Sequence, residues 1–221
     1  MKSHSGEQRP QTDAETAHQR FRGILGSGRL QAGQFVTQKE LLALLGVSLG
    51  PMRAALVRLE TEGYLHILPQ RGIQIVEPTL ERFREVLQMR IALEKEAWAK
   101  FAVTGSEADI DTFLDKNHAF AVRAQESAPE ALFREISAYD RTMHGAVVDH
   151  MHNSIISNQF RIARELSWSL RQDKGVVRHG NMDITLSSHI KILTACKKRD
   201  TAAVVNEVEQ HLMNGMLSFF V

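Results

Sequence analysis

The sequence is short of cysteine and of long apolar runs, and each shortage excludes a class of protein. Its one cysteine, Cys196, rules out an intrachain disulfide and with it the small disulfide-stapled secreted folds. No stretch stays apolar over the roughly 20 residues of a membrane-spanning helix, and no apolar leader lies near the start. The net charge of +1 is not that of a polycation, so nucleic-acid binding would need a local patch. We therefore expect a cytoplasmic protein that does not associate with membranes.

What the sequence does have is helical periodicity after Pro78. Apolar residues, 43% of the chain, recur at helical spacing between a few breakers. The pattern predicts helices at about 79–103, 106–125, 129–149, 152–171, 181–198 and 200–218. The expected fold is mainly α, with an antiparallel bundle of about six helices over residues 79–221 that binds an effector and dimerises the chain. Residues 1–12 are polar and are expected to form a flexible tail.

Residues 13–78 show a different order of elements. A helix is expected over 13–26, and Thr37 with Glu40 three residues later forms a capping box that opens a short helix ending at Gly46. Ser48 is placed to cap the next helix, which runs to Gly63. The spacing of apolar residues then indicates two short strands, 64–68 and 73–76, around a tight turn. Three helices followed by a hairpin predict a winged helix-turn-helix domain.

The second helix of such a motif presents its first turns to base edges in the major groove. Arg53 can offer a pair of donors to a guanine, and Leu49 can contact a thymine methyl group. An ordinary small helical domain with surface arginines remains the alternative. The residues predicted to contact DNA are Lys39, Ser48, Leu49, Gly50, Arg53, Arg58, Arg71 and Gly72.

A second pattern lies in the bundle. Asp140 and His144 are four residues apart, so a helix places them on one side, and His189 and His211 lie on later helices among apolar neighbours. A carboxylate with three imidazoles suits a divalent transition metal such as Zn, Ni, Fe or Mn. The alternative is that each histidine is a surface residue or a satisfied core residue.

Residues 13–78, which we call the head, resemble the DNA-binding domain of the GntR family. Two family positions differ after Ser48, because Leu49 and Gly50 stand where the family usually has arginine and threonine. The arginine that the family most often uses to read bases is therefore missing at position 49, which leaves the target sequence open, and Ala54 stands where the family usually has glutamate. The segments that carry the resemblance are Leu45-Gly46-Val47-Ser48, Pro51-Met52-Arg53, Ala55-Leu56, Leu59-Glu60, Glu62-Gly63 and Arg71-Gly72.

The bundle resembles the FCD domain of the FadR branch of that family. The matching segments are Arg90-Ile91-Ala92-Leu93-Glu94, Asp140-Arg141-Thr142-Met143-His144, His189-Ile190-Lys191-Ile192-Leu193 and His211-Leu212, with Ser188 where a glutamate often precedes the third ligand. The resemblance implies a divalent metal held by Asp140, His144, His189 and His211, beside a pocket for a small carboxylate effector. Residues expected to bind that effector are Arg90, Arg134, Asn158 and Arg164.

These features predict a homodimeric transcriptional regulator, a repressor rather than an activator, that binds double-stranded operator DNA and is not an enzyme. Its affinity for DNA is expected to depend on the carboxylate effector. Two alternatives stay open. One is a metal-dependent enzyme with a helical active site. The other is a metal-free DNA-binding dimer without effector control.

Overall fold

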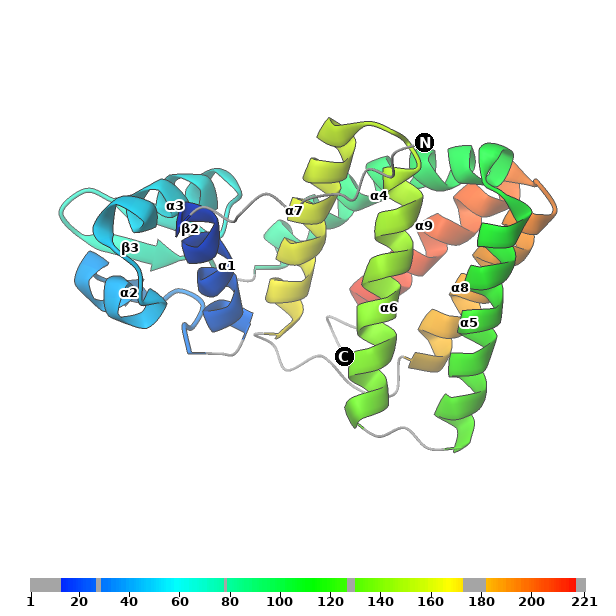
Figure 1. Ribbon diagram of the computed structural model, residues 1–221, viewed down its shortest axis with the longest axis horizontal. Helices are drawn as coiled ribbons and strands as arrows, with labels where there is room; N and C mark the ends of the chain where they lie inside the picture. Colours follow the sequence, from blue (N-terminus) through cyan, green and yellow to red (C-terminus); the bar gives the residue numbers. More distant parts are fainter. Residues whose placement is uncertain (1–12, 27–28, 78, 127–129, 173–181, 218–221) are drawn as a thin grey trace, which may run out of the picture. The chain divides into compact units, whose positions relative to one another are not determined.

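The computed structural model describes residues 13–26, 29–77, 79–126, 130–172 and 182–217 (Figure 1). The chain divides into two compact units, Met1–Glu77 and Pro78–Val221. The predicted tail, 1–12, lies outside the described residues. The fold is mainly helical with one small sheet, so the predicted fold class is confirmed.

The first unit is a winged helix-turn-helix. Its sheet has the order β1-β3-β2, with both pairs antiparallel. The short strand β1 was not predicted, because two residues are too few to show an alternating pattern. The elements are α1 (Asp13–Gly26), β1 (Phe35–Val36), α2 (Gln38–Leu45), α3 (Leu49–Thr61), β2 (Leu65–Leu68) and β3 (Gly72–Ile75).

The turn between α2 and α3 follows from local capping. The Thr37 side chain accepts a hydrogen bond from the Glu40 amide at 3.2 Å, and the Glu40 carboxylate accepts from the Thr37 amide at 2.7 Å, so the predicted capping box is confirmed. Gly46 ends α2 in the left-handed conformation (φ 60°), which glycine adopts at little cost. Ser48 occupies the N-cap of α3, but its side chain makes no capping hydrogen bond, contrary to expectation.

A buried polar network joins α1 to the end of α3. His18 Nε2 lies 2.5 Å from Glu62 Oε2, and both side chains are buried. Arg58 donates to Glu62 through Nε at 2.7 Å and forms an ion pair with Glu15 at 2.5 Å. Burial alone would raise the pKa of the Glu62 carboxyl, but the bonds from His18 and Arg58 hold it below its usual value. These contacts hold α1 against the C-terminal end of α3.

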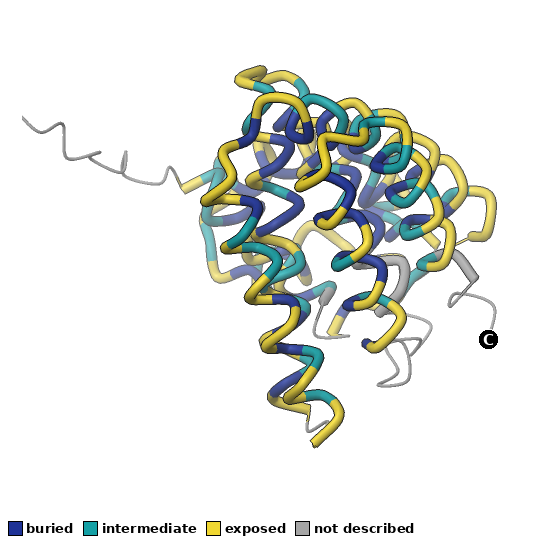
Figure 2. Tube along the Cα trace, turned by 90° about the vertical axis from the view of Figure 1, so that its right-hand side faces the viewer, coloured by how far each residue is buried: buried dark blue, intermediate teal, exposed yellow. Residues whose placement is uncertain are grey.

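The second unit is helical over its described residues. Helix α4 packs against α9, α7, α6 and α8, and α5 packs against α8 and α6. Figure 2 shows buried residues on the inner sides of these helices and exposed residues on their outer sides. The elements are α4 (Leu80–Thr104), α5 (Glu107–Glu126), α6 (Glu130–Asp149), α7 (Ser154–Gln172), α8 (Met182–Lys197) and α9 (Thr201–Leu217), close to the six predicted ranges.

The larger apolar cluster of this unit surrounds Trp98, which is fully buried on α4. Met143, Ile192 and Val208 bring α6, α8 and α9 to the same cluster. Cys196 is part of it, and burial raises the pKa of its thiol to about 12. The core therefore holds together the three helices that carry the predicted metal ligands.

Among the described residues, no single helix is both long and apolar enough to cross a membrane. The pair α2 and α3 meets the length and composition test only when taken together, across a bend of 103°. A bend of that size is the ordinary angle between the two helices of a helix-turn-helix.

Candidate metal centre

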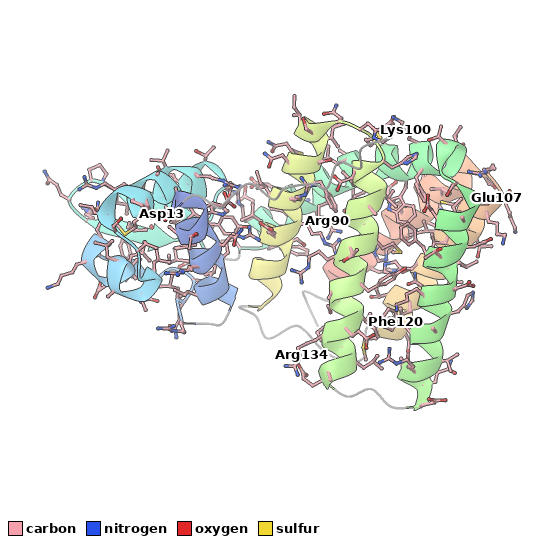
Figure 3. All side chains as sticks on the ribbon, viewed as in Figure 1. Asp13, Arg90, Lys100, Glu107, Phe120 and Arg134 are labelled. Atoms are coloured by element: carbon pink, nitrogen blue, oxygen red, sulfur yellow. The ribbon has the colours of Figure 1, made fainter. Side chains whose placement is uncertain are left out.

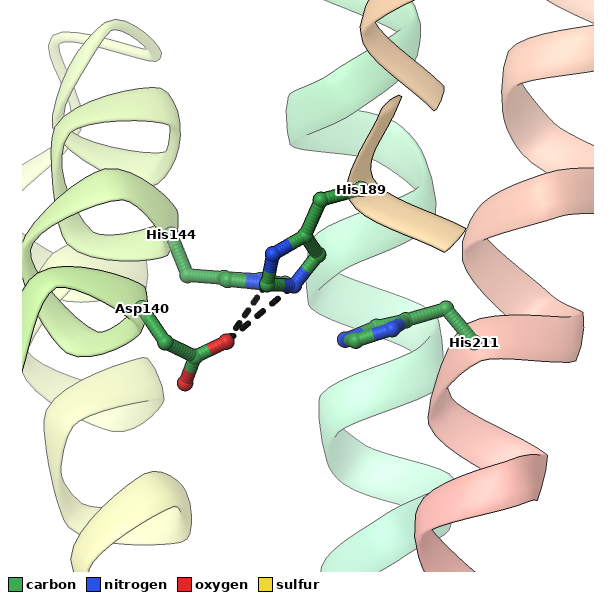
Figure 4. A group of neighbouring side chains, drawn as sticks. All are labelled: Asp140, His144, His189 and His211. Carbon is green, nitrogen blue, oxygen red and sulfur yellow. Dashed lines mark hydrogen bonds and ion pairs between the residues drawn. The ribbon is translucent and has the colours of Figure 1, made fainter. Parts of the chain in front are cut away.

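The structure brings together the four residues predicted to bind a metal (Figure 4). Asp140 and His144 come from α6, His189 from α8 and His211 from α9. One potential ligand atom from each lies within 4.8 Å of all the others. Asp140 Oδ1 is 3.1 Å from His189 Nε2 and 3.5 Å from His144 Nε2. Ligands about 2.0–2.2 Å from a divalent ion are separated by distances of this size.

Each imidazole is held by a partner on its other nitrogen. His144 Nδ1 lies 2.5 Å from Glu94 Oε2, a fully buried carboxylate on α4. His189 Nδ1 lies 3.1 Å from Asn117 Oδ1 on α5. His211 Nδ1 lies 2.7 Å from Ser188 Oγ on α8. All three rings therefore turn Nδ1 outward and Nε2 toward the cluster.

The partners also fix where the ring protons are. The amide nitrogen of Asn117 donates to the Phe113 carbonyl at 2.8 Å, so its oxygen is the atom that accepts from His189. The Ser188 hydroxyl donates to the Thr185 carbonyl at 2.8 Å, so its oxygen accepts from His211. A carboxylate such as Glu94 only accepts. We therefore assign a proton to each Nδ1, which leaves a lone pair on each Nε2.

Three lone pairs and a carboxylate oxygen then face one another across a short gap. His144 Nε2 and His189 Nε2 are 3.3 Å apart, and two facing lone pairs repel each other unless a cation lies between them. This donor set of three nitrogens and one oxygen fits Zn, Ni, Fe or Mn. The residues present thus fit a divalent metal, as the sequence predicted.

The ionisation of the cluster favours a cation as well. Burial would raise the pKa of the Asp140 carboxyl, but the charge of the neighbouring Arg164 guanidinium holds it well below its usual value, so it stays an anion. Burial lowers the pKa of His189, and burial together with the neighbouring imidazoles lowers that of His211 well below its usual value. Neutral imidazoles and an ionised carboxylate are the forms that bind metals.

Two of the arginines predicted to bind an effector lie at this cluster. Arg164 on α7 donates to Asp140 Oδ2, on the side of the carboxylate that faces away from the histidines. Arg90 on α4 is buried and donates to Glu94 Oε1 at 2.8 Å, so it reaches His144 through that carboxylate. Burial alone would raise the pKa of Glu94, but Arg90 and His144 hold it far below its usual value.

The other two predicted effector residues lie elsewhere. Arg134 is exposed near the start of α6, and Figure 3 shows it at the lower end of that helix. Asn158 is exposed on α7. Within the described residues, neither hydrogen-bonds to the four candidate ligands.

The sequence alone did not identify all of the residues that hold the Nδ1 atoms of the ligand histidines. In the sequence, Glu94 stands out only as part of the segment Arg90–Glu94, and Asn117 belongs to no motif. The signal for Asn117 was available, because it is a fully buried amide between Phe113 and Phe120 on the apolar side of α5. A buried polar side chain on an apolar helix face requires a polar partner, which here is a ligand histidine.

The predicted DNA-contacting residues lie mostly on the surface of the first unit. Lys39, Ser48, Leu49, Gly50, Arg53 and Arg71 are exposed. Arg58 has its charge compensated by its ion pairs with Glu62 and Glu15. Gly72 has φ 104°, and a Cβ there would lie 2.8 Å from the Val36 carbonyl oxygen, so it is needed for the close approach of β3 to β1.

Comparison with known proteins gives a match to each unit. Residues 85–214 match the family model described as the FCD domain, and residues 14–75 match that described as bacterial regulatory proteins of the gntR family. The HTH-type transcriptional regulator YdhC of Bacillus subtilis is 24% identical over 88% of this chain and 85% of its own. The Nta operon transcriptional regulator of Aminobacter aminovorans is 26% identical over 84% of this chain and 86% of its own. The solved structure of Escherichia coli McbR/YncC, at 18% identity, superposes with a TM-score of 0.72 over 96% of this chain and 98% of that one.

Proposed function

The chain belongs to the gntR family of bacterial regulatory proteins and carries an FCD domain, and from this premise we propose that a small carboxylate bound beside a divalent metal controls its affinity for operator DNA. The observation that carries the proposal is the convergence of Asp140, His144, His189 and His211, with the three imidazole lone pairs directed inward. We further propose that the protein is a cytoplasmic homodimer, that it binds a two-fold symmetric operator, and that it acts as a repressor.

The metal would supply charge and open coordination positions for an effector carboxylate. Four protein ligands leave such positions open on an ion that accepts five or six. Arg164 is the residue best placed to bind the effector as well, because its guanidinium already binds one carboxylate, that of Asp140, at the edge of the cluster. Arg90 is buried against Glu94, so we assign it to orienting His144 rather than to direct contact.

Helix α4 offers a physical route from the metal to the head. Glu94 on α4 holds His144, and α4 begins at Leu80, just after the boundary between the two units. Glu94 lies 14 residues after Leu80, which corresponds to about 21 Å along the helix. A shift of His144 on effector binding would be carried along α4 to the point where the head is attached.

Operator affinity measured against a panel of small mono- and dicarboxylates tests this proposal. The operator would be a duplex selected from a random library by the full chain, with binding followed by fluorescence anisotropy before and after chelation. We expect at least one carboxylate to weaken operator binding by about 5- to 150-fold, the usual range for allosteric coupling. Chelation should remove the effect. Because coupling is reciprocal, equal effector affinity with and without operator would contradict the proposal.

Replacement of Arg53 by alanine should weaken specific binding more than non-specific binding. The loss expected for one bidentate contact to a guanine is about 1–3 kcal/mol. The measurement compares the affinity for the selected operator with that for a scrambled duplex at one fixed salt concentration, because phosphate contacts depend strongly on salt. An equal loss on both duplexes would assign Arg53 to a phosphate instead.

A further inference from the structure

The outward face of the recognition helix α3 is unusually apolar. One side of the helix, with Met52, Ala55, Leu56 and Leu59, is buried in the head. The exposed residues of the helix are Leu49, Gly50, Arg53, Ala54 and Val57, followed toward its C-terminal end by Arg58, Glu60 and Thr61. The first five, which we call the outward face, include one cation and no anion, and the first turn of α3 contains no acidic residue. Electrostatic attraction therefore contributes little to the binding of this face to a partner.

The small residues of this face allow the backbone of α3 to approach a bound surface closely. Leu49 and Val57 are exposed by 40% and 62%, a high value for large apolar side chains. Between them, a Cβ at Gly50 would meet no other atom within 4 Å, and Ala54 adds only a methyl group. The helix backbone can thus lie near a surface that Leu49 and Arg53 both touch. These two residues are one turn apart, about 6 Å along the axis, which is nearly two base-pair steps.

The major groove of DNA carries one apolar group, the C5 methyl of thymine. We propose that α3 distinguishes its operator in part through a thymine methyl group, with Leu49 in contact with that methyl and Arg53 bound to a guanine one or two base pairs away. This inference rests on the proposed DNA-binding function and specifies how the base pairs are distinguished. It also explains how a mostly apolar helix face can be selective, since a methyl contact discriminates by shape and not by charge.

Polar groups at the ends of the outward face fit a backbone-positioning role. The Ser48 hydroxyl is not used as a cap, so it can bond a phosphate at the N-terminus of α3. Lys39 is exposed on α2, the other helix of the motif. Arg58 cannot contribute much to phosphate binding, because its charge is already neutralised by the carboxylates of Glu15 and Glu62. The arrangement leaves Leu49 and Arg53 as the residues that read bases.

Substitution of uracil for thymine tests the proposal, because it removes the methyl group and leaves every hydrogen-bonding group in place. The full chain first selects an operator from a random duplex library. Each thymine of one half-site is then replaced singly by uracil, and the dissociation constant is measured at fixed salt. For the wild-type protein we expect one position at which uracil weakens binding about fourfold, the effect of one buried methyl. No effect at any thymine would overturn the inference.

Variants then locate the contact on the protein. Leu49→Ala should bind the thymine and uracil duplexes equally, whereas Leu49→Met, which keeps an apolar side chain of similar volume, should still distinguish them. Lys39→Ala is the matched control and should weaken both duplexes by the same factor. A Leu49→Ala protein that folds and still prefers thymine would overturn the assignment. Failure to enrich any sequence would instead contradict the DNA-binding function itself.

Discussion

Replacement of His144 by alanine should reduce the metal content of the purified protein from about one divalent ion per chain to near zero, and should lower its melting temperature. His144 contributes one of three imidazoles, and its loss also leaves Oε2 of the buried Glu94 carboxylate without its histidine partner. A metal present at 100 to 1,000 times its dissociation constant stabilises the folded state by about 2.7–4.1 kcal/mol, so the expected loss is of that order. Elemental analysis and calorimetry on the same preparations measure the two effects.

The matched control is His118→Ala, since His118 is an exposed histidine on α5. It should leave metal content and melting temperature unchanged. Chelation of the wild-type protein should reproduce most of the His144→Ala loss in stability, and added metal should restore it. If His144→Ala retained a full equivalent of metal, the ligand assignment would be wrong.

Replacement of Glu94 by alanine should cost about 3–5 kcal/mol of unfolding free energy, even in protein from which metal has been removed. Glu94 is fully buried and joins two buried groups, Arg90 and His144. Its removal leaves the Arg90 guanidinium charged, desolvated and without its 2.8 Å carboxylate partner. This penalty does not depend on the metal, so chemical denaturation in the presence of chelator separates it from the effect of ligand loss.

Two further variants serve as controls for Glu94→Ala. Glu209→Ala removes the partner of Lys95 in a partly exposed ion pair between α9 and α4, and should cost less than about 1 kcal/mol. A double variant, Glu94→Leu with Arg90→Met, should be less destabilised than Glu94→Ala alone, because no buried charge is left unpaired. If Glu94→Ala and Glu209→Ala lowered the free energy of unfolding equally, the buried pair would contribute no more to stability than the exposed pair.

The sequence predicted the helices well because their signals are local. Gly46 ends α2 by its own conformational freedom, and the capping box at Thr37 and Glu40 needs only four neighbouring residues. Helical periodicity over 15 or more residues likewise needs no knowledge of the rest of the chain. The two-residue strand β1 gave no such signal, because it exists only through its pairing with β3.

The candidate site was predictable only in part, for a related reason. Asp140 and His144 share a helix, so their spacing alone places them on one side. Which side chains hold the outer nitrogens depends on how α4, α5 and α8 pack, and Asn117 lies 72 residues from the histidine that it binds. The ion pairs of Arg58 depend in the same way on the packing of α1 against α3, so a residue that reads as a free surface cation in the sequence proves to be neutralised.

The burial of Cys196 has a practical consequence for studies of this protein. Because the only thiol of the chain is buried and its pKa is raised to about 12, it is neither accessible nor ionised near neutral pH. Maleimide and methanethiosulfonate reagents should leave the native protein unlabelled. A cysteine introduced at an exposed head position such as Val57 would then be the sole reactive thiol on each chain. Spin labels at that site in a dimer would report the distance between two heads directly, with no background from the core.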